Sequence, residues 1–172
     1  MSDFLLDIRD LKLAFNSYAG LTEVLHGISL NIRRGEKVAL VGESGSGKSV
    51  TARIVLGLLQ ELSTARISGA VRFEGDDLEK QPLRVRQDLR GTRISMIFQD
   101  PTSSLNPVYP IATQFEEVLR RGDRQITPAD ARARAVTLLE DVSIPEPERV
   151  LASYPFQLSG GMNQRVMIAM AL

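Results

Sequence analysis

The chain has 172 residues, of which 43% are hydrophobic and 24% charged, a composition typical of one globular domain. Its 21 acidic and 21 basic residues give a formal net charge of zero, so the overall charge does not favour a polyanionic partner such as nucleic acid. The absence of cysteine excludes disulfides and thiolate-bound metals within these residues, and no uncharged apolar stretch reaches the roughly 20 residues that span a bilayer.

The first part of the chain contains three stretches that resemble β-strands. Leu5–Phe15 is the first, and Val24–Ile32 is the second, with apolar and polar residues alternating from Ile28 to Ile32. A short apolar run, Val38–Val41, follows a turn and predicts a third strand. These strands are expected to lead the chain directly into the segment that follows.

That segment fits the phosphate-binding pattern G-x-x-x-x-G-K-[ST] at every fixed position. Its residues are Gly42, Glu43, Ser44, Gly45, Ser46, Gly47, Lys48 and Ser49. Glycines let the backbone close around an anion with its N–H groups pointing inward, and the helix predicted over Val50–Leu59 adds a partial positive charge at its start. Lys48 is placed to reach the β- and γ-phosphates, and the Ser49 hydroxyl is placed to ligate Mg²⁺. A chance Gly/Ser-rich turn is disfavoured, because a strand pattern precedes the loop and a helix pattern follows it.

Two more strands are predicted beyond this helix. Gly69–Phe73 is the first, and a turn at Gly75–Asp77 ends it. Ile94–Phe98 is the second, and it is followed by Gln99 and then by Pro101, which does not continue a strand. A glutamine at the end of a strand is placed to contact a metal ion or water.

From Asp100 onward the pattern is helical and is interrupted by prolines, which predicts a separate helical subdomain. Thr127 is a good N-cap, Pro128 suits the first turn, and the predicted helix runs to Val142. Two groups of arginines are interpreted as solvated faces and not as a nucleic-acid patch. They are Arg84, Arg86, Arg90 and Arg93, and Arg120, Arg121, Arg124, Arg132 and Arg134.

A second candidate anion site lies near the end of the chain. Leu158, Ser159, Gly160, Gly161 and Met162 open an apolar helix that is predicted to run from Met162 to Leu172. A serine and two glycines at a helix start again present amides and a helix dipole. The sequence therefore predicts two separate phosphate-binding helix starts.

Together these motifs resemble the ATP-binding subunits of ABC transporters, and the resemblance spans nearly all 172 residues. It is closest to the subfamily that energises uptake of dipeptides, oligopeptides and nickel. The strings that carry it are Val41–Ser49, Phe98–Pro101 followed by Ser104–Pro107, and Gln157–Met162 continuing to Ala171. Met162 replaces the glutamine of most ABC ATPases but is usual in this subfamily, and Phe156 stands where peptide-importer relatives typically have histidine.

The resemblance implies an α/β fold, with a P-loop NTPase core, an N-terminal antiparallel β layer and a helical subdomain, incomplete at the C-terminus. The implied divisions are 1–99 for the β layer and ATP-binding core, 100–158 for the helical subdomain, and 159–172 for the signature helix returning toward the core. Phe15 is favoured over Tyr18 as the aromatic that stacks on adenine, although a core role is an equal alternative. The residues implied to contact ATP are Phe15, Gly42 to Val50 and Ser159 to Met162, with Lys48 and Gln99 in catalysis and Ser49 and Gln99 at Mg²⁺.

The resemblance also implies partners. The phosphate loop of one subunit and the signature residues Ser159, Gly160 and Gly161 of a second, identical or homologous subunit would enclose the same ATP. Gln99 and the loop from Asp100 to Asn106 would transmit the resulting change to membrane-spanning permease subunits, and a solute-binding protein outside the membrane would act indirectly. The expected location is therefore peripheral, on the cytoplasmic face of the inner membrane, with no nucleic-acid partner.

One part of the family pattern is missing from these residues. The acidic strand with the catalytic glutamate follows the signature helix in the family, and no acidic residue follows Met162 here. We therefore expect a truncated sequence that binds nucleotide without turnover by itself. An ABC-type ATPase acting on DNA or ribosomes is the alternative for the parent protein, but such proteins should lack the transporter-like stretch from Phe98 to Pro107.

Overall fold

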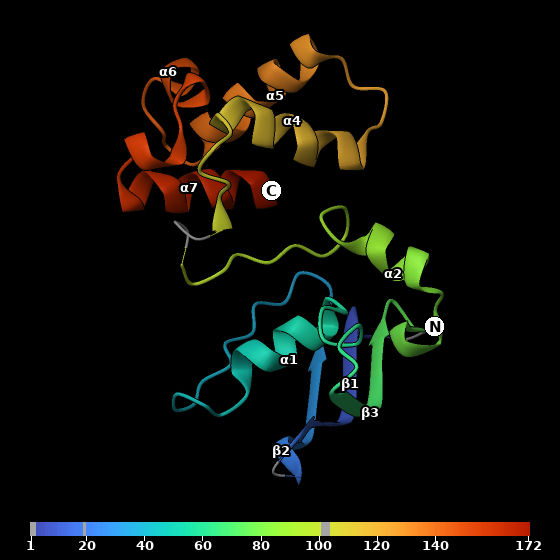
Figure 1. Cartoon of the computed structure of the whole chain (residues 1–172). Coiled ribbons are helices and arrows are strands. Elements are labelled where there is room, and N and C mark those ends of the chain that lie inside the picture. The colour runs from blue at the N-terminus through green and yellow to red at the C-terminus, as the bar shows by residue number, and fades with distance from the viewer. Residues whose placement is uncertain (1–2, 19, 101–103) are drawn as a thin grey trace. The chain divides into compact units, whose positions relative to one another are not determined.

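The computed structural model describes residues 3–18, 20–100 and 104–172. The chain forms two compact units, Met1–Asp88 and Leu89–Leu172 (Figure 1). The predicted stop of a strand at Pro101 lies outside the described residues.

The first unit is built on an antiparallel sheet with the strand order β2-β1-β3-β4 (Figure 1). Its strands are β1 (Leu6–Ser17), β2 (Gly20–Ile32), β3 (Ala65–Phe73) and the short β4 (Asp76–Asp77). The strands predicted at Leu5–Phe15, Val24–Ile32 and Gly69–Phe73 are confirmed, and each is longer than its pattern indicated. Glu74 and Gly75 both have positive φ, of 54° and 94°, so the predicted turn lies at the β3–β4 connection.

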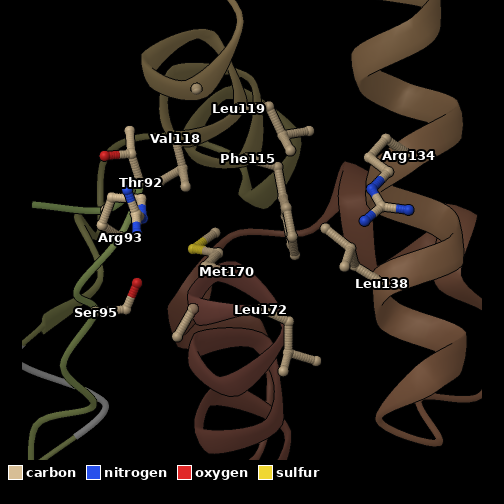
Figure 2. A pocket seen from close by; sticks show the side chains of 13 residues that line it. Thr92, Arg93, Ser95, Phe115, Val118, Leu119, Arg134, Leu138, Met170 and Leu172 are labelled. Atoms are coloured by element: carbon tan, nitrogen blue, oxygen red, sulfur yellow. The ribbon is translucent and has the colours of Figure 1, made fainter. Parts of the chain in front are cut away.

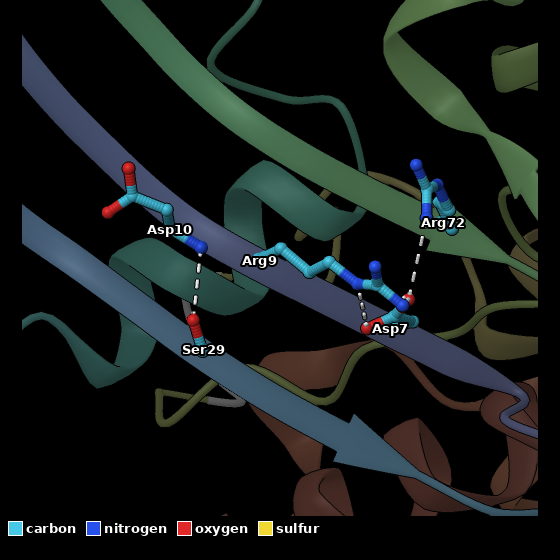
Figure 3. Close-up of polar contacts among 5 residues, drawn as sticks. All are labelled: Asp7, Arg9, Asp10, Ser29 and Arg72. Atoms are coloured by element: carbon cyan, nitrogen blue, oxygen red, sulfur yellow. Dashed lines mark hydrogen bonds and ion pairs between the residues drawn. The ribbon is translucent and has the colours of Figure 1, made fainter.

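A bulge in the central strand bends this sheet. Asp10 in β1 has φ 46°, and its backbone N–H donates to the hydroxyl of Ser29 at 3.0 Å (Figure 3). A Cβ at Gly69 would lie 2.4 Å from the carbonyl oxygen of Asp10, so β3 must have glycine beside the bulge. Close by in β1, the buried carboxylate of Asp7 accepts a hydrogen bond of 2.9 Å from Arg9 Nε, which stabilises the charge inside the sheet.

The helix that begins at the phosphate loop is shorter than predicted. Helix α1 covers Lys48–Val55 and does not reach Leu59. Gly57 has φ 68° and donates to Ile54 O at 2.8 Å, and Leu58 N donates to Arg53 O at 2.9 Å. These two bonds form a Schellman motif around a left-handed glycine, which terminates the helix.

Two predicted strands do not form. No strand covers residues 36–43, and in the segment 94–98 only Ile94 makes a single bridge, with Arg90. All residues of 36–43 are exposed, with Val41 at 90%, and in 94–98 the exposed residues include Ile97 at 44%, whereas Ile94 and Met96 are half-buried. An apolar run favours a strand buried between neighbours, but the strand exists only when neighbouring backbones supply hydrogen bonds.

Helices form the second unit (Figure 1). They are α4 (Ile111–Gly122), α5 (Pro128–Asp141), α6 (Pro147–Ala152), the 3₁₀ turn η2 (Pro155–Gln157) and α7 (Gly160–Ala171). The connection from the first unit contains η1 (Leu78–Lys80) and α2 (Leu83–Leu89), and the sequence interpretation predicted no helix there. The Thr127 hydroxyl accepts from Asp130 N at 3.2 Å, which confirms the predicted N-cap of α5.

One continuous apolar core holds these helices together. Phe115 of α4, Leu139 of α5, Val150 of α6 and Val166 of α7 are all buried in it. The proposed division into 1–99, 100–158 and 159–172 stays a prediction for the domain. In this structure α7 packs within the helical unit, chiefly against α5.

Candidate functional site

The phosphate loop folds around the ammonium group of Lys48. Lys48 Nζ donates to the carbonyl oxygens of Gly42 and Glu43 at 2.7 and 2.6 Å, and to Ser46 Oγ at 3.2 Å. A lysine at the first position of α1 therefore turns back over the loop that precedes it. The positive charge predicted for phosphate binding lies within this loop.

Glycines in the loop satisfy specific backbone requirements. Gly45 and Gly47 have φ 85° and 91°, a conformation that L side chains rarely adopt. At Gly42 a Cβ would lie 2.8 Å from Ser46 Oγ, so a side chain there would displace this hydroxyl. The pattern of small residues thus permits a closed turn that a chain with side chains at these positions would not make.

The start of α1 can serve as an anion site. Its N-cap is Gly47, which has no side chain to accept hydrogen bonds from the first-turn amides. Ser49 is exposed and Val50 is half-buried. Unpaired N–H groups, the helix dipole and the Lys48 charge together favour a triphosphate, and the Ser49 hydroxyl is the oxygen of this turn that could ligate Mg²⁺. Among the described residues, no group of three or more His, Cys, Asp or Glu side chains offers another metal site.

The two aromatic candidates for adenine stacking lie in different surroundings. Phe15 is half-buried within β1, opposite Thr22 of β2 and Ala65 of β3. Tyr18 is fully exposed just after the end of β1. Phe15 therefore has the fixed position that a stacking platform needs, although its partial burial also suits a packing role.

Gln99 is exposed and follows the segment that forms no strand. The turn beyond it is organised by Gln114 of α4, which the sequence interpretation did not single out. Gln114 Oε1 accepts from Asn106 N at 2.9 Å, and Gln114 Nε2 donates to the carbonyl oxygens of Asn106 and Tyr109, both at 3.0 Å. Its position four residues into a helix that follows Asn-Pro gave no recognisable signal.

The signature residues form the start of α7. Ser159 is the N-cap, and its hydroxyl accepts from Met162 N at 3.2 Å. Gly160 and Gly161 are exposed, and a Cβ at either would meet nothing within 4 Å. Asn163, which the sequence interpretation passed over, is buried and donates from Nδ2 to Pro155 O at 3.0 Å, so it fastens the helix start to η2.

The predicted site residues are thus distributed over the two units. Phe15 and the phosphate loop, Gly42 to Val50, belong to the first unit. Gln99 and the signature residues, Ser159 to Met162, belong to the second.

Neither of two pockets contains a predicted site residue. In the helical unit, a pocket of about 350 Å³ lies between Phe115, Leu138 and Leu172, with Arg93 and Arg134 also lining it (Figure 2). In the sheet unit, a pocket of about 440 Å³ has a mixed lining that includes Lys12, Glu23, His26 and Arg66.

Elsewhere, Arg120 pairs with Glu116 at 2.7 Å and Arg132 pairs with Glu148, in keeping with solvated, ion-paired faces.

Comparison with known proteins shows which family has these features. The sequence profile described as "ABC transporter" matches residues 25–172. Two similar curated proteins are the peptidoglycan transport ATP-binding protein YejF of Agrobacterium fabrum, 48% identical, and the oligopeptide transport ATP-binding protein OppD of Bacillus subtilis, 44% identical. Each alignment covers 98% of this chain. The chain spans 31% of the length of the first and 47% of the second.

Solved structures agree with the sequence comparison. The dimeric post-hydrolysis state of the ATP-binding cassette MJ0796, bound to ADP and Pi, matches with a TM-score of 0.83 and 27% identity. The match covers 97% of this chain and 68% of that one. The chain therefore has the fold of part of an ABC ATPase cassette. Within the described residues, no helix has the length and apolar character needed to span a bilayer.

Proposed function

The chain belongs to the ABC transporter family, and from that membership we propose that it is the ATP-binding and hydrolysing subunit of a transporter that takes up peptides or nickel. The observation that carries the proposal is the loop of residues 42–49, which surrounds the Lys48 ammonium and leads into the uncapped start of α1. A cation close to an uncapped helix start provides the charge and the amides that a triphosphate requires.

In the proposed site, the loop binds ATP by its phosphates. The Lys48 ammonium exchanges the Gly42 and Glu43 carbonyl oxygens for phosphate oxygens, and the first-turn amides of α1 bind the remaining charge. Ser49 and Gln99 would hold Mg²⁺, which neutralises the developing charge on the phosphates when bound. Phe15 would carry the adenine ring.

The glycines of the signature support a second contact with ATP. Gly160 and Gly161 belong to α7 without a positive φ and have open space around them, so no described residue of the helical unit requires glycine at either position. Glycine at a helix position costs about 0.5–1 kcal/mol relative to alanine. We attribute the bare helix start to an external group that approaches the backbone closely, namely the γ-phosphate of an ATP bound to a second subunit.

Such a shared ATP would join the two subunits. ADP lacks the γ-phosphate, so it would bind the joined state less well, and a ligand shifts a two-state equilibrium only by this difference in affinity. Gln99 and the turn that Gln114 holds would pass the change to membrane-spanning permease subunits on the cytoplasmic face of the membrane. The name of the Bacillus subtilis relative OppD, an oligopeptide transport ATP-binding protein, supports peptides as the transported class.

The test is ATP binding by the chain and by its Lys48→Ala variant, measured by titration with a fluorescent ATP analogue in the presence of Mg²⁺. We expect saturable binding by the unsubstituted chain and at least a hundredfold weaker binding by the variant, on the order of 3 kcal/mol for a lost charge-assisted contact. Lys80→Ala is the matched control, because this ammonium pairs with Asp77 at 3.4 Å outside the loop. Equal affinities in Lys48→Ala and the unsubstituted chain would place the phosphate site elsewhere.

A further inference from the structure

Gly47 is the residue on which the phosphate loop and α1 meet. It is buried, it is the N-cap of the helix, and its φ is 91°. Its carbonyl carbon and the nitrogen of Lys48 belong to one planar peptide unit, so the Gly47 C=O and the Lys48 N–H point in opposite directions. Whatever fixes the direction of that carbonyl therefore fixes the direction in which the Lys48 amide faces a phosphate.

Thr51 holds this carbonyl with two donors. The backbone N–H of Thr51 donates to Gly47 O at 2.8 Å, and its Oγ donates to the same oxygen at 2.9 Å. The residue is only 3% exposed, although it is polar and lies outside the eight-residue loop pattern. Its hydroxyl donates to the carbonyl oxygen of Gly47, which belongs to the same peptide unit as the Lys48 N–H.

Leu25 of β2 constrains Gly47 from another direction. Its Cδ2 lies 2.3 Å from the point that a Cβ on Gly47 would occupy, and its Cγ lies 3.8 Å away. Leu25 is 3% exposed, so neighbouring atoms limit its ability to move aside. Leu25 thus fills the space beside the Gly47 Cα, while Thr51 bonds the carbonyl of the same residue.

We propose that Leu25 and Thr51 are positioning residues of the phosphate loop, which together fix the Gly47–Lys48 peptide so that its N–H faces the bound phosphate. This inference rests on the ATP-binding function proposed above and adds residues from outside the sequence motif to it. Neither side chain contacts the nucleotide in this arrangement. Both act through the backbone of Gly47.

The first experiment separates the Thr51 hydroxyl from the bulk of its side chain. Thr51→Val keeps the shape and removes the donor, whereas Thr51→Ser keeps the donor and removes a methyl group. We expect Thr51→Val to weaken binding of the fluorescent ATP analogue about fivefold, the size of one lost hydrogen bond, and Thr51→Ser to restore most of the affinity. Thermal melts of both variants identify any general loss of folded protein.

Results of this first experiment separate the inference from the function on which it rests. Equal affinity of Thr51→Val and the unsubstituted chain, with Lys48→Ala still impaired, would overturn the positioning role and leave the ATP site intact. Failure of the unsubstituted chain to bind the analogue would overturn both proposals. Weak binding by Thr51→Ser as well as Thr51→Val would show that packing, and not the hydroxyl, matters at this position.

The second experiment is a double-mutant cycle between Leu25 and Gly47. Gly47→Ala introduces both backbone strain and an overlap with Leu25, but only the overlap is relieved when Leu25→Ala is also present. We therefore expect Gly47→Ala to weaken analogue binding about tenfold more in the parent than in the Leu25→Ala background, a coupling typical of residues in contact. Equal losses in both backgrounds would contradict the role of Leu25.

Leu11→Ala is the matched control for the cycle. Leu11 lies in the sheet and, at 1% exposure, is buried to the same degree as Leu25. None of its atoms is among the three nearest to the Gly47 Cβ position. It should lower the melting temperature as Leu25→Ala does and leave the Gly47→Ala effect at its parental size. Coupling of Leu11 to Gly47 as strong as that of Leu25 would refute a specific contact.

Discussion

Gly161→Ala should make the protein more stable and less able to function. Gly161 is the second residue of α7, its φ is not positive, and a Cβ there meets nothing within 4 Å. Alanine should therefore gain the helix preference of about 0.5–1 kcal/mol without a steric cost. For a chain of 172 residues this corresponds to a rise in melting temperature of about 1–4 °C.

The same methyl group should obstruct ATP-driven association. If the γ-phosphate of a second subunit's ATP approaches the α7 amides, the new Cβ lies in its path. Sedimentation of the full-length gene product with Mg²⁺ and ATP should show dimers for the unsubstituted protein and fewer for Gly161→Ala. Gly122→Ala is the control, because Gly122 is another exposed helical glycine with open space around it. It should raise the melting temperature by a similar amount and leave ATP-dependent association unchanged.

Opposite signs in the two assays are the critical result. A variant that is stabilised and still forms dimers at the same ATP concentration would refute the assignment of α7 as a nucleotide contact. A variant that is destabilised would refute the structural premise that no neighbour restricts this glycine. Loss of association in Gly122→Ala as well would point to a general effect of helix stability.

The remaining predictions concern other parts of the two units. Ser159→Arg should leave analogue binding by the phosphate loop unchanged but abolish the ATP-dependent dimer in sedimentation, and an intact dimer would count against the shared site. Thr127→Ala should lower the free energy of unfolding by about 1 kcal/mol in urea melts, because the N-cap of α5 is lost; no change would mean that solvent replaces the cap. Gly69→Ala should cost about 2–4 kcal/mol in the same assay, since its Cβ overlaps the Asp10 carbonyl at φ 99°, and a neutral result would show that the bulge relaxes. Residues 1–172 expressed alone should bind ATP with negligible turnover, as no acidic residue follows the signature, and steady ATPase activity would refute this.

Local patterns predicted those features whose cause is local. The Thr127 cap and the Ser159 cap depend on side chains that bond amides three residues ahead, so a few neighbouring residues suffice to predict them. Gly45 and Gly47 of the phosphate loop are similar, because their positive φ is a property of the turn itself. The early end of α1 also has a local cause, namely Gly57. A single glycine inside a helical pattern is often tolerated, so the sequence did not show that the helix ends there.

Contacts between distant residues could not be predicted in this way. The run Val38–Val41 has the composition of a buried strand, yet a strand depends on partners elsewhere in the chain, and none pairs with it among the described residues. Gln114 and Asn163 gave no signal because their partners lie eight residues away across a turn. Their roles appear only when the turn is folded.

By itself the sequence determined the family, and it predicted two helix starts as phosphate sites with Lys48 as the cation of the loop, since each depends on residue types at short fixed spacings. Tertiary structure alone decided that Leu25 of β2 lies against Gly47, whereas Thr51 reaches the same glycine from one helical turn away. Leu25 is 22 residues from Gly47 in the chain, and no periodicity relates a strand residue to a loop glycine at that distance. Packing placed Leu25 beside Gly47, because the burial of apolar surface is favourable whether or not the residues are close in sequence.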